Sequence, residues 1–198
     1  VHPDHPPAKL SRTAHTTWSL DDVAFTNGPY LDANTTATTL TPASAGTGTG
    51  VNITASAITG INNNVGWLAT DVGREIFFNS GKATITARTN STVAVATITT
   101  AFTNTNATVA FQLDAWSGTT GYPRTVSFFE QRLVFGGSSS YPQTIWASES
   151  GLYEEFDVGT GSAADAFIYT IAANKVNVIR WLAPARDLIV GTVGGEFK

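Results

Sequence analysis

Short apolar runs separated by glycine, serine, asparagine and proline recur along the chain, without the spacing of an amphipathic helix. The segment 121–151, GYPRTVSFFEQRLVFGGSSSYPQTIWASESG, shows this pattern best. It holds apolar stretches at 125–129, 131–136 and 144–148, and a Gly/Ser/Tyr/Pro loop at 137–142. Such stretches between turn residues are typical of an antiparallel sheet. We therefore predict an all-β fold organised around this segment.

The same pattern predicts strands on both sides of that segment. They are expected at 9–14, 16–20, 35–41, 51–56, 74–78, 83–88, 92–98, 109–113, 167–171, 175–182 and 187–193. Alternation places Ile85 and Ala87 on one face of their strand and Thr84 and Thr86 on the other. Many short strands between residues 31 and 113 indicate a small β-barrel or β-sandwich.

Composition divides the chain into three segments, 1–30, 31–115 and 116–198, because residues 31–115 are rich in threonine, asparagine and alanine and poor in charge. A weak repeat relates RLVFG at 132–136 to DLIVG at 187–191. Repeated multi-strand units are typical of propeller blades, although any two buried strands that end in glycine also look alike. The chain lacks an initial methionine and stops after a strand-like run, so we expect it to be part of a longer protein.

Charge and composition narrow the classes of function. Charged residues make up 13% of the 198 residues and the net charge is −4, which argues against a basic nucleic-acid-binding surface. No apolar run approaches the roughly 20 residues of a membrane span, and residues 1–10 lack the apolar core of a signal peptide. The chain has no cysteine, which excludes disulfides and thiol chemistry.

Candidate chemical groups are few. Metal binding could use His2, Asp4, His5 and His15, but the Pro-rich segment that holds three of them favours solvated loop histidines. Acid–base chemistry needs paired carboxylates, and the candidates are Asp21, Asp22, Asp71, Glu75, Asp114, Glu154 and Glu155. No motif fixes a partner for any of them. The GTGTG run at 46–50 lacks the lysine and helix start of a phosphate-binding loop, which favours a flexible loop.

Aromatic side chains could stack on sugars. The candidates are Trp18, Trp67, Trp116, Trp146, Trp181, Tyr122, Tyr141 and Tyr153. Trp146 and Trp181 lie in strand-like runs, where a place in the core is favoured. Tyr141 and Tyr153 lie in predicted loops and are better candidates for contact with a partner or ligand. Asn34, Asn52, Asn90 and Asn106 fit the N-x-Ser/Thr acceptor pattern, which matters only in a eukaryotic secretory route.

Three runs of sequence resemble a known family. HPPAKLSRTAHTTWSL near the start, GYPRTVSFFEQRLVFGG with PQTIWASESGLYEEFD, and VIRWLAPARDLIVGTVGGEF resemble the tail-nozzle, or tail tubular, structural proteins of short-tailed bacteriophages. The resemblance covers about residues 2–30 and 116–198. It implies a β-propeller-like platform, incomplete in this chain and truncated at its C-terminus, that begins in 1–30 and continues in 116–198. Residues 31–115 correspond to an inserted small β-barrel or β-sandwich domain, with DVGREIFF and ATITA as its recognisable part.

The resemblance implies a virion structural component of the phage tail, not an enzyme, with no catalytic, metal or cofactor-binding residues. The full-length protein is expected to form a homo-oligomer, a hexameric ring that contacts adjacent tail proteins and lets DNA pass without specific binding. Expected contact residues are Arg124, Glu130, Arg132, Tyr141 and Tyr153.

Two other classes of function stay open at this point. One is a carbohydrate- or host-receptor-binding β module of a phage or bacterial surface protein, which would bind a surface glycan through Trp67 or Tyr141. The other is a hydrolase that uses Asp71 or Glu154.

Overall fold

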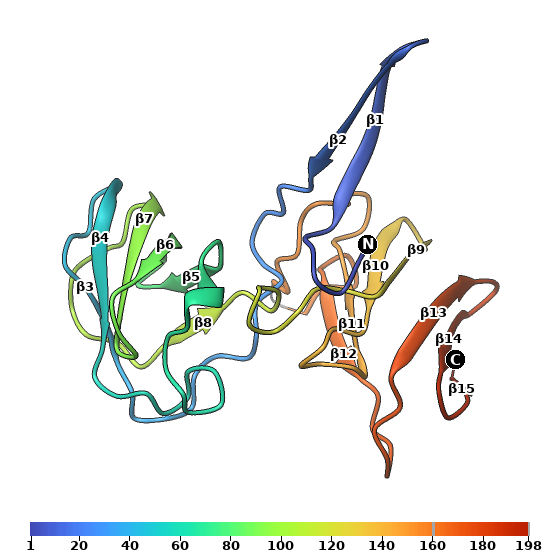
Figure 1. The fold of residues 1–198 in the computed structure, drawn as a ribbon. Helices are drawn as coiled ribbons and strands as arrows, with labels where there is room; N and C mark the ends of the chain where they lie inside the picture. The colour runs from blue at the N-terminus through green and yellow to red at the C-terminus, as the bar shows by residue number, and fades with distance from the viewer. Residues whose placement is uncertain (160, 198) are drawn as a thin grey trace. The chain divides into compact units, whose positions relative to one another are not determined.

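The computed structural model describes residues 1–159 and 161–197 and has an all-β fold, with 45% of the chain in strands (Figure 1). The all-β prediction is therefore confirmed. The one helical element among the described residues is a turn of 3-10 helix, η1 (Ala69–Asp71). None of the described helical segments has the length and hydropathy to cross a bilayer. The chain divides into two compact units: unit 1 comprises Val1–Pro29 and Thr120–Lys198, and unit 2 comprises Tyr30–Thr119.

Unit 2 contains a six-stranded antiparallel sheet that curls into a half-barrel (Figure 1). In spatial order its strands are β3 (Leu40–Pro42), β4 (Gly48–Ala55), β7 (Val93–Thr100), β6 (Gly81–Arg88), β5 (Glu75–Phe78) and β8 (Phe111–Leu113). Its buried face carries one apolar cluster, whose largest members include Leu40, Ile53, Trp67, Ile76, Phe78 and Phe111. This unit therefore has a core of its own.

Strands β5, β6 and β7 follow the alternation that their sequence predicts, up to one irregularity. Gly81, Ala83 and Ile85 are buried on β6, and Lys82 and Thr84 between them are half-buried. The pairing of β6 with β7 then shifts between Ile85 and Ala87, as at a β-bulge, and Ala87 is exposed. The prediction that Ile85 and Ala87 share a face is wrong, because an extra residue in a strand reverses the faces beyond it.

The strand predicted at 35–41 is also wrong in its first part, because β3 begins only at Leu40. The cause is the side chain of Asn34. Its amide nitrogen donates to the carbonyl oxygens of Thr36 and Thr38 at 3.2 and 3.1 Å, and its Oδ1 accepts from the Thr36 N–H at 3.1 Å. Asparagine side chains that bond nearby backbone in this way stabilise turns in competition with strands.

Unit 1 contains three antiparallel sheets. A two-stranded sheet pairs β1 (Ala8–Ala14) with β2 (Thr17–Asp22). A four-stranded sheet has the order β12 (Phe167–Thr170), β11 (Thr144–Ala147), β10 (Arg132–Gly136) and β9 (Thr125–Phe129), which makes it a simple meander. A three-stranded sheet contains β13 (Ile179–Pro184), β14 (Leu188–Thr192) and β15 (Glu196–Phe197).

The last two sheets share one apolar cluster. Val134, Ile145 and Ala147 of the four-stranded sheet pack with Ile179 and other residues of the three-stranded sheet. The two runs of the weak repeat occupy matching places, since β10 lies between β9 and β11 and β14 lies between β13 and β15. The shared core joins these sheets into one packed body.

Candidate interaction surface

The β1–β2 hairpin presents an apolar face. Its register pairs Leu10 with Leu20 and Arg12 with Trp18, and alternation puts these four residues on the same face. Leu10, Trp18 and Leu20 are 63%, 56% and 69% exposed. The Arg12 guanidinium lies 5.3 Å from the centre of the Trp18 ring, in a cation–π contact. Three large apolar side chains therefore face solvent together.

This hairpin receives little support from the rest of the described chain. Its strands pair only with each other among the described strands, and every β2 residue is exposed. An isolated two-stranded hairpin is at best marginally stable in water, because it has no second layer to bury its apolar face. Its exposed face is therefore a candidate surface for a partner.

A groove of about 420 Å³ lies beside β9 and β10 of the four-stranded sheet. Val126 and Phe128 of β9 line it, and they are 40% and 60% exposed. Tyr153 stands at the rim, with its ring edge-on to Phe128 at 5.2 Å between centroids. Further lining residues are Val1, Pro7, Ala8, Lys9, Val23, Leu133, Phe135 and Glu154. The groove is mainly apolar, and aromatic rings of this kind supply much of the binding energy at protein interfaces.

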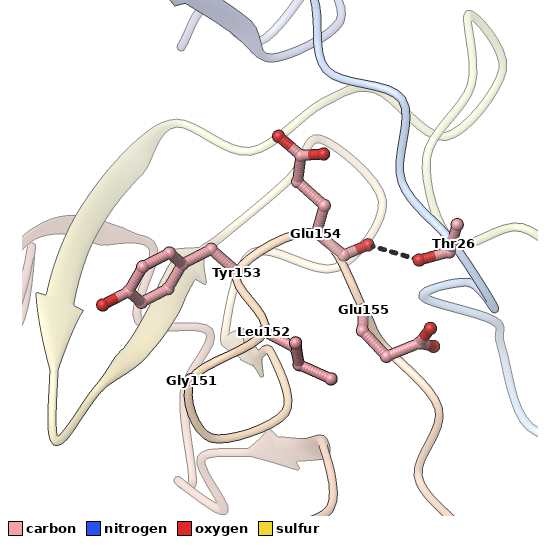
Figure 2. Close-up of a pocket in the computed structure, with 6 residues that line it drawn as sticks. All are labelled: Thr26, Gly151, Leu152, Tyr153, Glu154 and Glu155. Carbon is pink, nitrogen blue, oxygen red and sulfur yellow. Dashed lines mark hydrogen bonds between the residues drawn. The ribbon is translucent and has the colours of Figure 1, made fainter.

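An acidic depression of about 340 Å³ adjoins the rim (Figure 2). Its walls are Thr26 and residues 151–155. Thr26 holds the loop in place, because its N–H and hydroxyl both donate to the carbonyl oxygen of Glu154, at 2.7 and 3.1 Å. In Figure 2 the side chains of Tyr153, Glu154 and Glu155 leave this loop in three directions. Lys9 forms an ion pair with Glu154, and the Glu155 carboxylate accepts from the Asp157 N–H at 3.1 Å.

Among the predicted contact residues, Tyr153 and Glu130 lie on the surface. Tyr153 is 45% exposed and lines both the apolar groove and the acidic depression. Glu130 is exposed in the β9–β10 turn, where Glu130 and Gln131 adopt φ values of 46° and 61°. Two consecutive residues with positive φ are typical of the tight turns of β-hairpins.

Arg124 and Tyr141 are half-buried. The Arg124 side chain donates to the Ser139 hydroxyl at 3.2 Å, which ties it to the loop 137–142. The Tyr141 ring lies edge-on to Trp146 at 6.5 Å between centroids. Both residues therefore support the loop 137–142, and each keeps part of its surface accessible.

Arg132 is placed otherwise than predicted. It is 7% exposed, and its guanidinium donates to the carbonyl oxygens of Ser148, Asp165 and Ala163 at 2.5, 2.7 and 2.5 Å. The ring of Phe167 covers it at 5.6 Å. Arg132 therefore joins the four-stranded sheet to the segment 163–165, and its burial makes the predicted subunit contact wrong.

The carboxylates that sequence suggested for catalysis are divided between the two units, and in unit 2 the charges of Arg74 and Glu75 both act on Asp114. Asp71 is fully buried, where its Oδ1 meets Arg74 at 3.3 Å and accepts from the Thr119 hydroxyl at 2.7 Å. Desolvation raises the pKa of Asp114 to about 7, against the lowering effect of a bond from the Trp116 N–H and of the nearby Arg74 charge. Glu154 and Glu155 lie in the acidic depression of unit 1. Asp71 thus belongs to the internal structure of unit 2.

The remaining candidates from the sequence are the histidines, considered for metal binding, and the tryptophans, considered for sugar stacking. His2 and His5 lie 5.1 Å apart between ring centroids, and no three metal-binding side chains gather anywhere in the described part of the chain. Trp146 is buried as predicted, but Trp181 is 41% exposed. Trp67 is fully buried in the core of unit 2, which removes it as a sugar-stacking residue.

Sequence reasoning missed the exposed apolar face of β9. The sequence predicted a strand at 125–129, and in the structure Phe128 and Val126 point to solvent, whereas Ser127 and Phe129 are half-buried. The strand TVSFF does alternate, and this alternation separates Phe128 from Phe129. The alternation does not show which face of β9 packs against the rest of unit 1, because a polar residue such as Ser127 can lie on the half-buried face.

No protein-family model matches the chain, and no curated protein matches it.

Proposed function

We propose that this chain is a structural component of a bacteriophage tail, of the nozzle or tube type, which acts through assembly with other subunits. The observation that carries the proposal is the geometry of unit 1. A four-stranded antiparallel meander is followed directly by a second antiparallel sheet that shares its core. Successive sheets of this kind are how β-propeller blades are built.

The sequence resemblance supports the proposal from a separate direction. The runs QRLVFGG and TIWA, which carry part of the resemblance, lie on β10 and β11, and DLIVG lies on β14. The two copies of the repeat thus occupy second strands of consecutive sheets, as repeated blades require. On this proposal unit 1 is part of a propeller-like platform, and unit 2 is a small β-barrel domain inserted into it.

The surface of unit 1 suits an assembling subunit. It exposes an apolar hairpin face and an apolar groove, features that mark interaction sites in proteins of this size. The net charge of −4 suits a ring through which DNA passes without being gripped, because tight DNA binding needs clustered lysine and arginine. A homo-oligomeric ring at the tail, next to other tail proteins, is the arrangement that we propose for the full-length protein.

The alternative of a carbohydrate- or host-receptor-binding module keeps one supporting observation. Tyr153 is exposed beside a depression with two carboxylates, and such a combination can bind sugar hydroxyl groups. Of the two aromatic residues expected for that function, Trp67 is buried and Tyr141 is half-buried. We therefore rank the structural role first.

Composition of purified particles tests the proposal. Particles produced from the genome that encodes this chain would be banded by density and digested, and peptides would be quantified against the capsid and tail proteins. We expect peptides of this chain in a fixed ratio of a few copies per particle. Particles that are infectious and tailed but contain no such peptides would contradict the proposal.

A further inference from the structure

The four-stranded sheet of unit 1 ends at β12, and one long side of this strand is open. Among the described strands only β11 pairs with β12. All four residues of β12 are exposed, and Tyr169 is 59% exposed. Proteins commonly protect such an edge with charged side chains, proline or a bulge. Residues 166–174, AFIYTIAAN, contain no charged residue and no proline. The edge of β12 can therefore accept another strand.

The hydrogen-bond pattern shows which backbone groups of β12 face outward. The Ile171 N–H donates to the Gln143 carbonyl at 3.0 Å. Hydrogen-bonded pairs alternate with non-bonded pairs in an antiparallel ladder. In this register Tyr169 also bonds to β11, whereas Ile168 and Thr170 direct their N–H and C=O groups away from it. No hydrogen bond from the described residues reaches these outward groups. Two donors and two acceptors therefore alternate along the edge.

An apolar pocket of about 280 Å³ lies beside the same edge. Its walls come from both sheets of the unit and include Ile145, Tyr169 and Ile171 on one side and Leu188, Val190 and Phe197 on the other. Tyr169 and Ile145 are cross-strand partners, so their side chains lie on one face of the sheet. Most of the lining residues belong to the core that the two sheets share. The pocket is therefore an opening of that core at the end of the four-stranded sheet.

An added strand would satisfy the backbone groups and cover the pocket together. Residues directly opposite each other in a sheet share a face, so the residue opposite Tyr169 directs its side chain to the pocket side. Two β12 edges paired so that all outward groups bond would set Tyr169 against Tyr169, and no apolar side chain would enter either pocket. A charged residue is disfavoured there, because neither the edge nor the pocket lining carries an opposite charge.

We propose that the edge of β12 binds an extended, uncharged segment of a partner protein as a fifth strand, with an apolar side chain opposite Tyr169. The backbone bonds at Ile168 and Thr170 give affinity and the pocket gives specificity, as in other complexes formed by strand addition. The inference is independent of the tail role, because any protein can offer such a strand. Its tests use the full chain and synthetic peptides, so their failure leaves the tail role as it stands.

Amide hydrogen exchange of the full chain in dilute solution tests whether the edge is open. We expect the amides of Ile168 and Thr170 to exchange about tenfold faster than those of Tyr169 and Ile171, which bond to β11. Equal protection of all four amides at every concentration would overturn the open edge. Protection of Ile168 and Thr170 that increases with protein concentration would assign the edge to a second copy and overturn the partner-protein inference.

Synthetic nonapeptides serve as probes of the strand. They carry valine at odd and threonine at even positions, and only the central residue is varied among leucine, phenylalanine, alanine and glutamate. We expect fluorescence polarisation to show about tenfold tighter binding with leucine or phenylalanine than with glutamate, and binding to slow the exchange of Ile168 and Thr170. Peptides that do not bind, or that bind equally with glutamate at the centre, would overturn the inference.

A proline variant tests the backbone contact itself. Ile168→Pro removes one outward N–H that takes no part in the pairing with β11, a position where edge strands accept proline. We expect about tenfold weaker peptide binding, and the matched control Ile168→Thr, which keeps the N–H, should bind within a fewfold of the wild type. Unchanged exchange at Tyr169 checks that β12 stays paired. Wild-type affinity in the proline variant would overturn the contact.

Methylation of the peptide backbone gives a readout that needs no variant of the chain. N-methylation of the peptide at alternate residues should weaken binding, and at the intervening residues it should leave binding unchanged, because only alternate N–H groups of an added strand face its neighbour. Equal tolerance at every position would overturn strand addition.

Discussion

Charged side chains inside this protein are held by internal backbone carbonyls and by opposite charges. Arg132 donates to three carbonyl oxygens, and Arg74 donates to the Asp114 carbonyl at 2.9 Å and to Asn62 Oδ1 at 2.7 Å. From sequence, Arg132 and Asp71 were candidates for contact and catalysis. An isolated Arg or Asp is expected on the surface, and only the carbonyls and side chains that surround it in the fold show that it is internal.

Asp114 provides a pH-dependent prediction at this scale. Its pKa is raised by desolvation from 3.8 to about 7, so the folded state binds its proton more tightly than the unfolded state does. Its contribution to the free energy of unfolding is therefore fully present below about pH 4 and is lost as the pH rises towards 7. This change in pKa corresponds to a loss of at most about 4 kcal/mol, and water that reaches the half-buried side chain makes the loss smaller.

The variant Asp114→Asn isolates this effect, since it keeps the shape of the neutral side chain and cannot ionise. We expect the stability of the variant relative to the wild type to increase between pH 4 and pH 8. Denaturant unfolding followed by fluorescence at several pH values measures the difference. A difference that stays constant over this range would contradict the raised pKa.

At the scale of strands and hairpins, most elements could be predicted from the sequence. The run TVSFF became β9 with the predicted bounds, and β10, β11 and β12 each lie within one residue of the prediction. Those runs are bounded by glycine, proline or polar turn residues, which mark strand ends locally. The bulge after Ile85, the late start of β3 and the strand β15 were not predicted. They depend on cross-strand register and on side-chain hydrogen bonds, which have no local signature.

The hairpin of β13 and β14 supplies a prediction for one glycine. Gly191 lies opposite Trp181 in the register, and a Cβ at this position would overlap the indole ring. Gly191→Ala should therefore lower the free energy of unfolding by about 1–3 kcal/mol, as overpacking does. The matched control is Gly48→Ala in β4, where a Cβ would meet no atom within 4 Å.

Thermal unfolding and tryptophan fluorescence of both variants give the measurement. We expect a lower melting temperature for Gly191→Ala and a red-shifted emission as Trp181 moves into water, with little change for Gly48→Ala. Equal behaviour of the two variants would show that Trp181 does not pack on Gly191.

At the scale of the whole molecule, the chain is divided between two units with separate cores. The apolar cluster of unit 2 runs from Leu31 to Leu113 along the sequence, and that of unit 1 runs from Phe129 to Phe197. The ends of unit 2 meet, because the Leu31 N–H donates to the Leu113 carbonyl at 2.8 Å. The change in composition near residue 31 could indicate such a unit, and its bounds at Tyr30 and Thr119 come from these contacts.

This organisation predicts that unit 2 can be removed and studied alone. Residues 30–119 should fold by themselves, because their core and paired ends are complete, and they should unfold cooperatively with well-dispersed amide resonances in NMR spectra. The chain in which a short Gly/Ser linker replaces 30–119 should keep the strands of unit 1. Collapsed spectra for residues 30–119 would contradict the independence of the two units.

We propose that the chain is a structural subunit of a phage tail, and electron cryomicroscopy of particles from the encoding genome tests this proposal. We expect density at the distal end of the tail into which unit 1 and unit 2 fit separately, repeated around the channel axis by rotational symmetry. Complete tails whose density is fully explained by other proteins, with no place for either unit, would contradict it.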